Sequence, residues 1–202
     1  MKRDIIISLL LPFLFFAHCK KEEKKKTNSL PTYKAPDPSI DEKEQIYKDK
    51  KQLRAEVKQD YKITNASSDR TKAVTDFLSE AANKGESKEY DHLFNDKELR
   101  DIYLPNITDT KVLIANTTIA KAMYILKLRK QIGVNKMLQT IYGKKFKLKE
   151  ILWRRDIREV NAIKFHIIDG VLLEIDGKTF ELEAMKAVLE HEGQFKLCIV
   201  GT

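Results

Sequence analysis

The repeat of apolar residues changes near Gly143, and this change constrains the fold more than any other feature of the sequence. Before Gly143, apolar side chains recur every three or four residues, which is the spacing of one helical face. After it, apolar and polar residues alternate, as they do in strands with one buried face. Helices followed by antiparallel strands predict an α+β domain, with the helices packed on the single apolar face of the sheet.

The clearest predicted helix covers residues 70–84. Its apolar residues fall on one face, and a capping residue is available at each end. Ser68 or Asp69 is suited to the N-cap, because a short polar side chain accepts a hydrogen bond from a free backbone N–H group. Gly85 is suited to the C-terminal end.

Three further helical segments are expected. A long helix is predicted over residues 117–142, with Asn116 as its cap and Gly143 as its end. Residues 41–66 are rich in charge with few apolar positions, which favours a peripheral or stalk helix. The segment 90–106 predicts a short helix before the long one.

Turn signals set the expected register of the strands. A three-residue loop, Ile168-Asp169-Gly170 with Gly170 left-handed, would place Phe165 opposite Leu173 and keep their rows on one face. His191-Glu192-Gly193 follows the same logic and would pair Leu189 with Phe195.

The remaining turn signal is Asp176-Gly177, read as a two-residue turn. It would place Phe180 opposite Leu173. Between Ala184 and Met185 the positions expected to face the core change from even-numbered to odd-numbered residues. This change indicates either a bulge or a short intervening helix.

This order of elements resembles the NTF2-like and cystatin-like cones, in which a curved sheet wraps a long helix. The resemblance concerns element order and covers residues 67–202, the predicted α+β domain. Such cones often hold a pocket at the open end of the sheet, and their members include enzymes, ligand carriers and structural modules. The resemblance therefore implies a place for a site without deciding its function.

The first 18 residues have the pattern of a signal peptide. Lys2 and Arg3 precede an apolar run over residues 5–17, which is well short of the roughly 20 residues that a membrane-spanning helix needs. Lysines follow the run almost at once. An ordinary cleaved signal and an uncleaved anchor are the alternatives, and Phe15 disfavours ordinary cleavage after Ala17.

The run ends in Phe16-Ala17-His18-Cys19, which resembles the lipobox of a bacterial lipoprotein precursor, most closely the looser lipoboxes of spirochaetes. The resemblance implies that Cys19 carries lipid, including palmitate, and becomes the first mature residue. It also implies a protein of the cell envelope held to a membrane, such as the outer membrane, with the periplasmic or surface side left open.

A tether is predicted over residues 19–40. Lysine, glutamate and proline dominate it, and it lacks the apolar side chains that would offset the entropy of ordering it. A lysine run beside a membrane attracts anionic headgroups by about 1 kcal/mol per charge. A merely solvated linker explains the composition equally well.

The net charge is less informative than its total suggests. Of the formal +8, residues 1–18 carry +1 and residues 19–40 carry +3, which leaves 8 − 1 − 3 = +4 for residues 41–202. Export argues against a nucleic-acid partner. A basic cluster could meet anionic lipid or acidic glycans, although alternation with apolar residues favours the solvent face of a strand. The cluster consists of Lys144, Lys145, Lys147, Lys149, Arg154, Arg155 and Arg158.

No catalytic, cofactor-binding or metal-binding motif is present in the sequence. His92, His166 and His191 are isolated, so packing or surface roles are favoured over a metal site. Cys198 is expected to be a buried apolar side chain, with a thiol activated by His191 as the alternative. Trp153 is expected to pack in the core, with a recognition patch beside Arg154 and Arg155 as the alternative.

Two functions remain open at this point. The first is a lipid-anchored, non-enzymatic module that binds an unidentified partner or supports the envelope. The second is a small hydrolase or isomerase with its pocket on the concave face of the sheet. Titratable side chains converging on that face would distinguish the enzyme.

Overall fold

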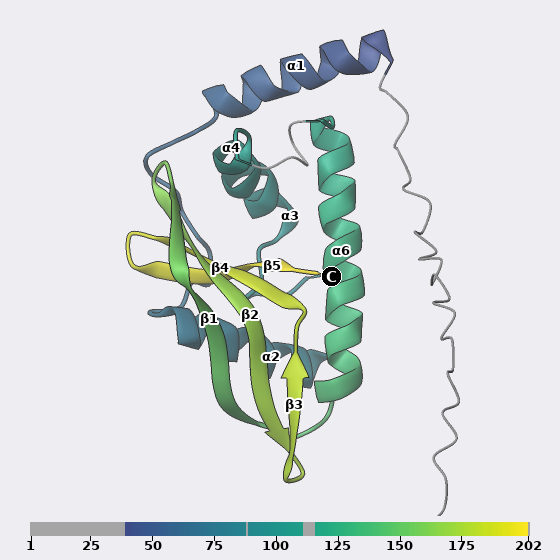
Figure 1. The fold of residues 1–202 in the computed structure, drawn as a ribbon, viewed down its shortest axis with the longest axis vertical. Helices are drawn as coiled ribbons and strands as arrows, with labels where there is room; N and C mark the ends of the chain where they lie inside the picture. Colours follow the sequence, from purple (N-terminus) through teal and green to yellow (C-terminus); the bar gives the residue numbers. More distant parts are fainter. Residues whose placement is uncertain (1–38, 88, 111–115, 202) are drawn as a thin grey trace, which may run out of the picture. The chain divides into compact units, whose positions relative to one another are not determined.

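The fold is described from a computed structural model, over residues 39–87, 89–110 and 116–201. These residues belong to one compact unit that begins at Pro38. Helices precede a five-stranded antiparallel sheet, so the predicted α+β class is confirmed (Figure 1). The predicted signal peptide, Cys19 and the tether up to residue 38 lie outside the described residues.

The elements follow one another in a simple order. The helical elements are α1 (Ile40–Ala55), α2 (Arg70–Lys84), α3 (Asp96–Glu98), the π-helical turn η1 (Leu99–Tyr103), α4 (Leu104–Ile107) and α6 (Ile119–Ile141). The strands are β1 (Lys147–Val160), β2 (Ile163–Ile175), β3 (Lys178–Leu182), β4 (Met185–His191) and β5 (Gln194–Val200).

Helix α2 has the predicted bounds and caps. The Asp69 side chain accepts a hydrogen bond from the Lys72 N–H group at 2.8 Å, and Gly85 ends the helix with a φ of 66°. That positive φ suits glycine, because a Cβ atom disfavours left-handed backbone. A Cβ atom at Gly85 would also lie 2.5 Å from the ring of Tyr142.

The other helices differ from expectation mainly at their ends. Thr118 caps α6 in place of Asn116, since its side chain accepts from the Lys121 N–H group. Helix α1 ends at Ala55 and packs against α4, with Leu53 fully buried. The short helix predicted within residues 90–106 is the α3, η1 and α4 series.

Strand β2 is the long central strand of the sheet. The sheet order is β1-β2-β4-β5, and β3 and β4 pair with successive halves of the same edge of β2. The chain leaves the ladder at Glu183 and Ala184, between β3 and β4. This break explains why the core-facing positions change there from even-numbered to odd-numbered residues.

The predicted loop Ile168-Asp169-Gly170 is wrong. Strand β2 continues through these residues, and a bulge places the Phe165 and Leu173 rows on opposite faces. Gly170 lacks the left-handed backbone that a tight turn would need. A Cβ atom there would lie 2.5 Å from Glu181 Oε1, the end of an exposed and flexible side chain that can move aside.

The two later turns give one confirmation and one correction. Asp176-Gly177 is the predicted two-residue turn, and Phe180 pairs with Leu173 as expected. The second turn consists of Glu192-Gly193 alone, so His191 pairs with Gln194 and the predicted pairing of Leu189 with Phe195 is wrong. Both residues of that turn have positive φ, which is the geometry of a tight two-residue hairpin.

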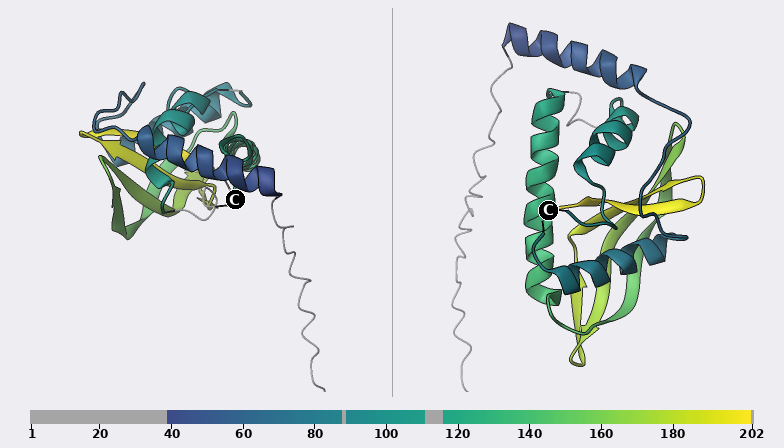
Figure 2. Two further views of the ribbon diagram at one scale, coloured as in Figure 1. Left: turned by 90° about the horizontal axis from the view of Figure 1, so that it is seen from above. Right: turned by 180° about the vertical axis from the view of Figure 1, so that it is seen from behind.

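Apolar side chains are buried on both faces of the sheet, which corrects the expectation of a single apolar face. One cluster joins α2 to Val171, Leu173 and Leu197, and the other joins η1 and α4 to Phe165 and Leu189. Helix α6 contributes to both clusters. Figures 1 and 2 show α2 and the α3 to α4 segment beside different parts of the sheet, with α6 alongside.

Candidate functional site

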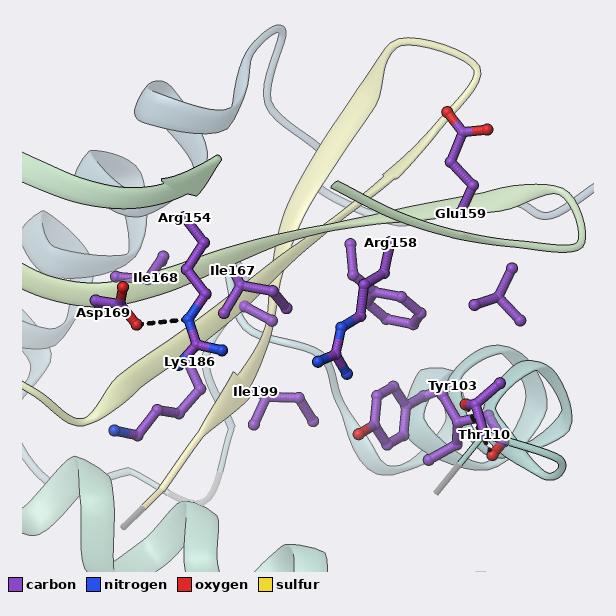
Figure 3. Close-up of a pocket in the computed structure, with 14 residues that line it drawn as sticks. Tyr103, Thr110, Arg154, Arg158, Glu159, Ile167, Ile168, Asp169, Lys186 and Ile199 are labelled. Atoms are coloured by element: carbon purple, nitrogen blue, oxygen red, sulfur yellow. Dashed lines mark hydrogen bonds and ion pairs between the residues drawn. The ribbon is translucent and has the colours of Figure 1, made fainter. Parts of the chain in front are cut away.

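A pocket of about 500 Å³ lies between the sheet and the end of α4. Side chains from β1, β2, β4 and β5 line one side of it, and Tyr103, Ile107 and Thr110 line the other (Figure 3). This volume falls in the range of small-molecule sites, which are about 300–1,000 Å³. The pocket is therefore the candidate site.

Most of the pocket surface is apolar. Phe165 and Ala187 are buried at its floor, whereas Ile167 and Ile199 are half-buried and remain accessible within it. Tyr103 packs edge-on against Phe165, with ring centroids 5.8 Å apart. Apolar surface of this kind favours a ligand with an apolar part.

The hydroxyl of Tyr103 is the most informative polar group of the pocket. Tyr103 is only 8% exposed, yet its hydroxyl forms no hydrogen bond with any described residue. Figure 3 shows the Arg158 side chain above the Tyr103 ring, with the hydroxyl pointing towards the side of the pocket where Ile199 lies. Burial raises the pKa of Tyr103 well above its usual value, so the group stays a neutral O–H donor.

Five charged side chains line the pocket, three basic and two acidic. Asp169 is paired with Arg154 at 2.7 Å, and Glu159 pairs with Lys164 outside the pocket at 3.5 Å. Arg158 and Lys186 have no ion pair or hydrogen bond among the described residues. Two cations are thus left without a counter-charge at the pocket.

A bulge in β1 forms the wall that carries Arg154 and Arg158. Trp153 pairs with Ile168 and Ile157 pairs with His166, so β1 advances four residues where β2 advances two. The two additional residues of β1 bend the strand, as bulges do. The predicted basic cluster is exposed throughout, and only Arg154 and Arg158 of its members line this pocket.

Trp153 points away from the pocket. Its ring packs against the α2 core cluster and lies 4.6 Å beneath the guanidinium of Arg70. His166, buried on the strand face opposite Phe165, contacts Glu190 at 2.6 Å and Arg70 at 3.3 Å. The predicted packing role of Trp153 is confirmed.

Cys198 is buried as predicted, at 3% exposure. Its thiol donates to the Ala187 carbonyl at 3.2 Å, and burial raises its pKa far above the usual range. His191 is engaged elsewhere: Nε2 accepts from the Tyr61 N–H group and Nδ1 donates to the Ala162 carbonyl. The structure therefore does not form the activated thiol pair.

The same two hydrogen bonds occupy both ring nitrogens of His191. Asp60, His191 and Glu192 lie close enough together to suggest a metal site. A histidine binds metal through a free ring nitrogen, and neither nitrogen of His191 is free. His191 is therefore a buried hydrogen-bonding residue, with Asp60 and Glu192 as exposed neighbours.

A buried ion pair that the sequence did not predict connects β5 to α3. Lys196 is 2% exposed, and its ammonium lies 2.9 Å and 3.1 Å from the two carboxylate oxygens of Glu98. The ammonium also donates to the Thr64 carbonyl at 2.8 Å. Every polar partner is supplied from within the fold, so this pair joins β5 to α3 and is not a candidate ligand site.

The described helices include none that is long and apolar enough to cross a membrane. No protein-family model matches the sequence, and no curated protein or solved structure shows significant similarity to it. The functional proposal therefore depends on the pocket and on the N-terminal sequence. Sequence reasoning missed Tyr103 and Lys186 as pocket residues, because neither belongs to a motif.

Proposed function

We propose that this chain is a lipid-anchored protein of the cell envelope whose domain binds a partly apolar small molecule without catalysing a reaction. One observation carries the binding part of the proposal. Tyr103 is 8% exposed as a residue and lines an apolar pocket, and its hydroxyl forms no hydrogen bond with any described residue. A ligand in the pocket would cover this hydroxyl, and a covered polar group usually has a hydrogen-bond partner, which an acceptor on the ligand would supply.

The pocket side chains favour binding over catalysis. Acid–base catalysis needs a titratable group free to exchange a proton with the substrate. Here both lining carboxylates are engaged in ion pairs, and neither histidine nor cysteine is among the described lining residues. The remaining polar groups are donors that orient a ligand.

The anchoring part of the proposal rests on Phe16-Ala17-His18-Cys19 and the lysine-rich residues that follow. In a bacterial host supplied with radioactive palmitate, the wild-type chain should take up label and Cys19→Ala should not. Equal labelling of the two proteins would remove the anchoring proposal. This outcome would leave the pocket proposal untouched.

The pocket itself is tested with a neutral dye that fluoresces in apolar surroundings, such as Nile red. Ile199→Trp places a larger side chain in the pocket and should reduce dye binding. The matched control is Ile157→Trp, since Ile157 is 46% exposed on β1 and does not line the pocket. Equal dye binding by both folded variants would contradict the proposal.

A further inference from the structure

We infer that the pocket ligand is an alkyl or acyl amphiphile with one anionic head, a carboxylate or phosphate, held by Arg158 and Tyr103. This inference rests on the proposed binding function and names the ligand class for the same pocket. Two independent observations carry it. They are the unpaired donors in the pocket lining and the aliphatic side chains that share this lining.

Arg158 supplies the charge for the head group. Its side chain extends from β1 towards Tyr103 in Figure 3, and it has no ion-pair partner among the described residues. Nearby Arg154 differs, because Asp169 already neutralises it at 2.7 Å. A guanidinium forms paired hydrogen bonds with the oxygens of a carboxylate or phosphate, which makes Arg158 the specific contact.

Tyr103 supplies a second donor in the same pocket. The raised pKa keeps its hydroxyl protonated, so it donates to an anion without repelling it. Lys186, which is also unpaired, adds positive charge at another edge of the pocket. The unneutralised charge at the pocket is therefore positive, which complements an anionic head and disfavours a cationic one.

The aliphatic side chains account for the tail. Ile167 and Ile199 lie between Arg158 and Lys186 in Figure 3, and Val160 is also half-buried in the pocket lining. These side chains present no hydrogen-bonding groups to a polar ligand. Each methylene group of a ligand that is buried against such side chains raises the binding affinity about fourfold.

The test measures binding of four compounds to the full chain carrying Cys19→Ala, below the micelle concentration of each compound. Dodecanoate and dodecyl phosphate are expected to bind at least about tenfold more tightly than dodecanol, because only they engage Arg158 as anions. Dodecanoate, with two more methylenes, should bind about sixteenfold more tightly than decanoate. A preference between the two anions supports the inference and assigns the head.

Variants locate the head. Arg158→Gln should lower dodecanoate affinity about tenfold and leave dodecanol affinity unchanged. Tyr103→Phe should lower dodecanoate affinity several-fold. The matched control Arg155→Gln removes an exposed neighbour outside the pocket and should have no effect. Equal binding of dodecanoate and dodecanol, unaffected by Arg158→Gln, would overturn the inference while the dye result still supports a pocket. Failure of all four compounds together with the dye would overturn both proposals.

Discussion

Replacing Lys196 by methionine should destabilise the domain strongly, because it leaves the Glu98 carboxylate buried without its counter-ion. Lys196 and Glu98 have side-chain exposures of only 2% and 6%, and their closest atoms are 2.9 Å apart. Breaking a buried pair by removing one partner costs about 3–5 kcal/mol. For a domain of this size, 1 kcal/mol corresponds to about 2–4 °C, so the thermal midpoint should fall by about 6–20 °C.

The chain offers a matched control with the same residue types and the same separation. Lys149 and Glu174 also lie 2.9 Å apart, but their side chains are 45% and 37% exposed. Water and salt screen an exposed pair. Lys149→Met should therefore unfold at the wild-type denaturant concentration, so that the difference between the two variants measures the effect of burial.

Urea denaturation followed by circular dichroism provides the measurement. The midpoint should shift for Lys196→Met while the slope stays that of the wild type. Glu98→Gln should also be destabilising, and the double variant should lose less stability than the sum of the single losses, because both act on one pair. A loss below about 1 kcal/mol for Lys196→Met, or strict additivity, would refute the reasoning.

Three other predictions follow from the structure. Removing residues 19–38 should leave the thermal midpoint within about 5 °C of the wild type, measured by calorimetry, because the cap Ser39 and both core clusters are retained. Cys198→Ala should cost about 1–2 kcal/mol in denaturant unfolding, and the native thiol should react slowly with a thiol reagent at neutral pH, whereas rapid reaction would contradict its burial. Arg100 holds the pKa of Glu56 below its ordinary value of 4.5, so their pair stabilises the fold above that pH and the stabilisation is lost as pH falls through the lowered pKa. Acid titration of Glu56→Gln should show a smaller loss of stability over this range than the wild type, and identical curves would contradict the linkage.

The sequence alone determined the elements whose signals are local. Helix α2 was predicted with both ends because Asp69 and Gly85 satisfy backbone groups within a few residues of themselves. The Asp176-Gly177 hairpin was predicted because two left-handed residues between alternating strands leave few other conformations. The burial of Cys198 followed from its place in an apolar strand.

The tertiary structure decided what local signals leave ambiguous. Asp169-Gly170 has the composition of a turn, yet the continued pairing of β2 with β1 on both sides of it makes it a bulge. That bulge sends successive apolar rows of β2 to opposite faces, so α-helical segments cover both sides. A one-residue change in register reverses every side chain beyond it, and only packing selects between the two outcomes.

The candidate site is also a feature that only the tertiary structure decided. Tyr103 and Arg158 are separated by 55 positions in the chain and line one pocket only because the fold places the π-helical turn and the bent β1 strand around it. From the sequence alone, Lys196 would be expected to be a solvent-facing strand residue. In the fold it is buried, and Glu98, which is far away in the sequence, supplies its counter-charge. Local sequence thus determined where the helices and two turns form. Burial and pairing between distant residues, which depend on the folded arrangement, determined which polar groups are neutralised and which are left for a ligand.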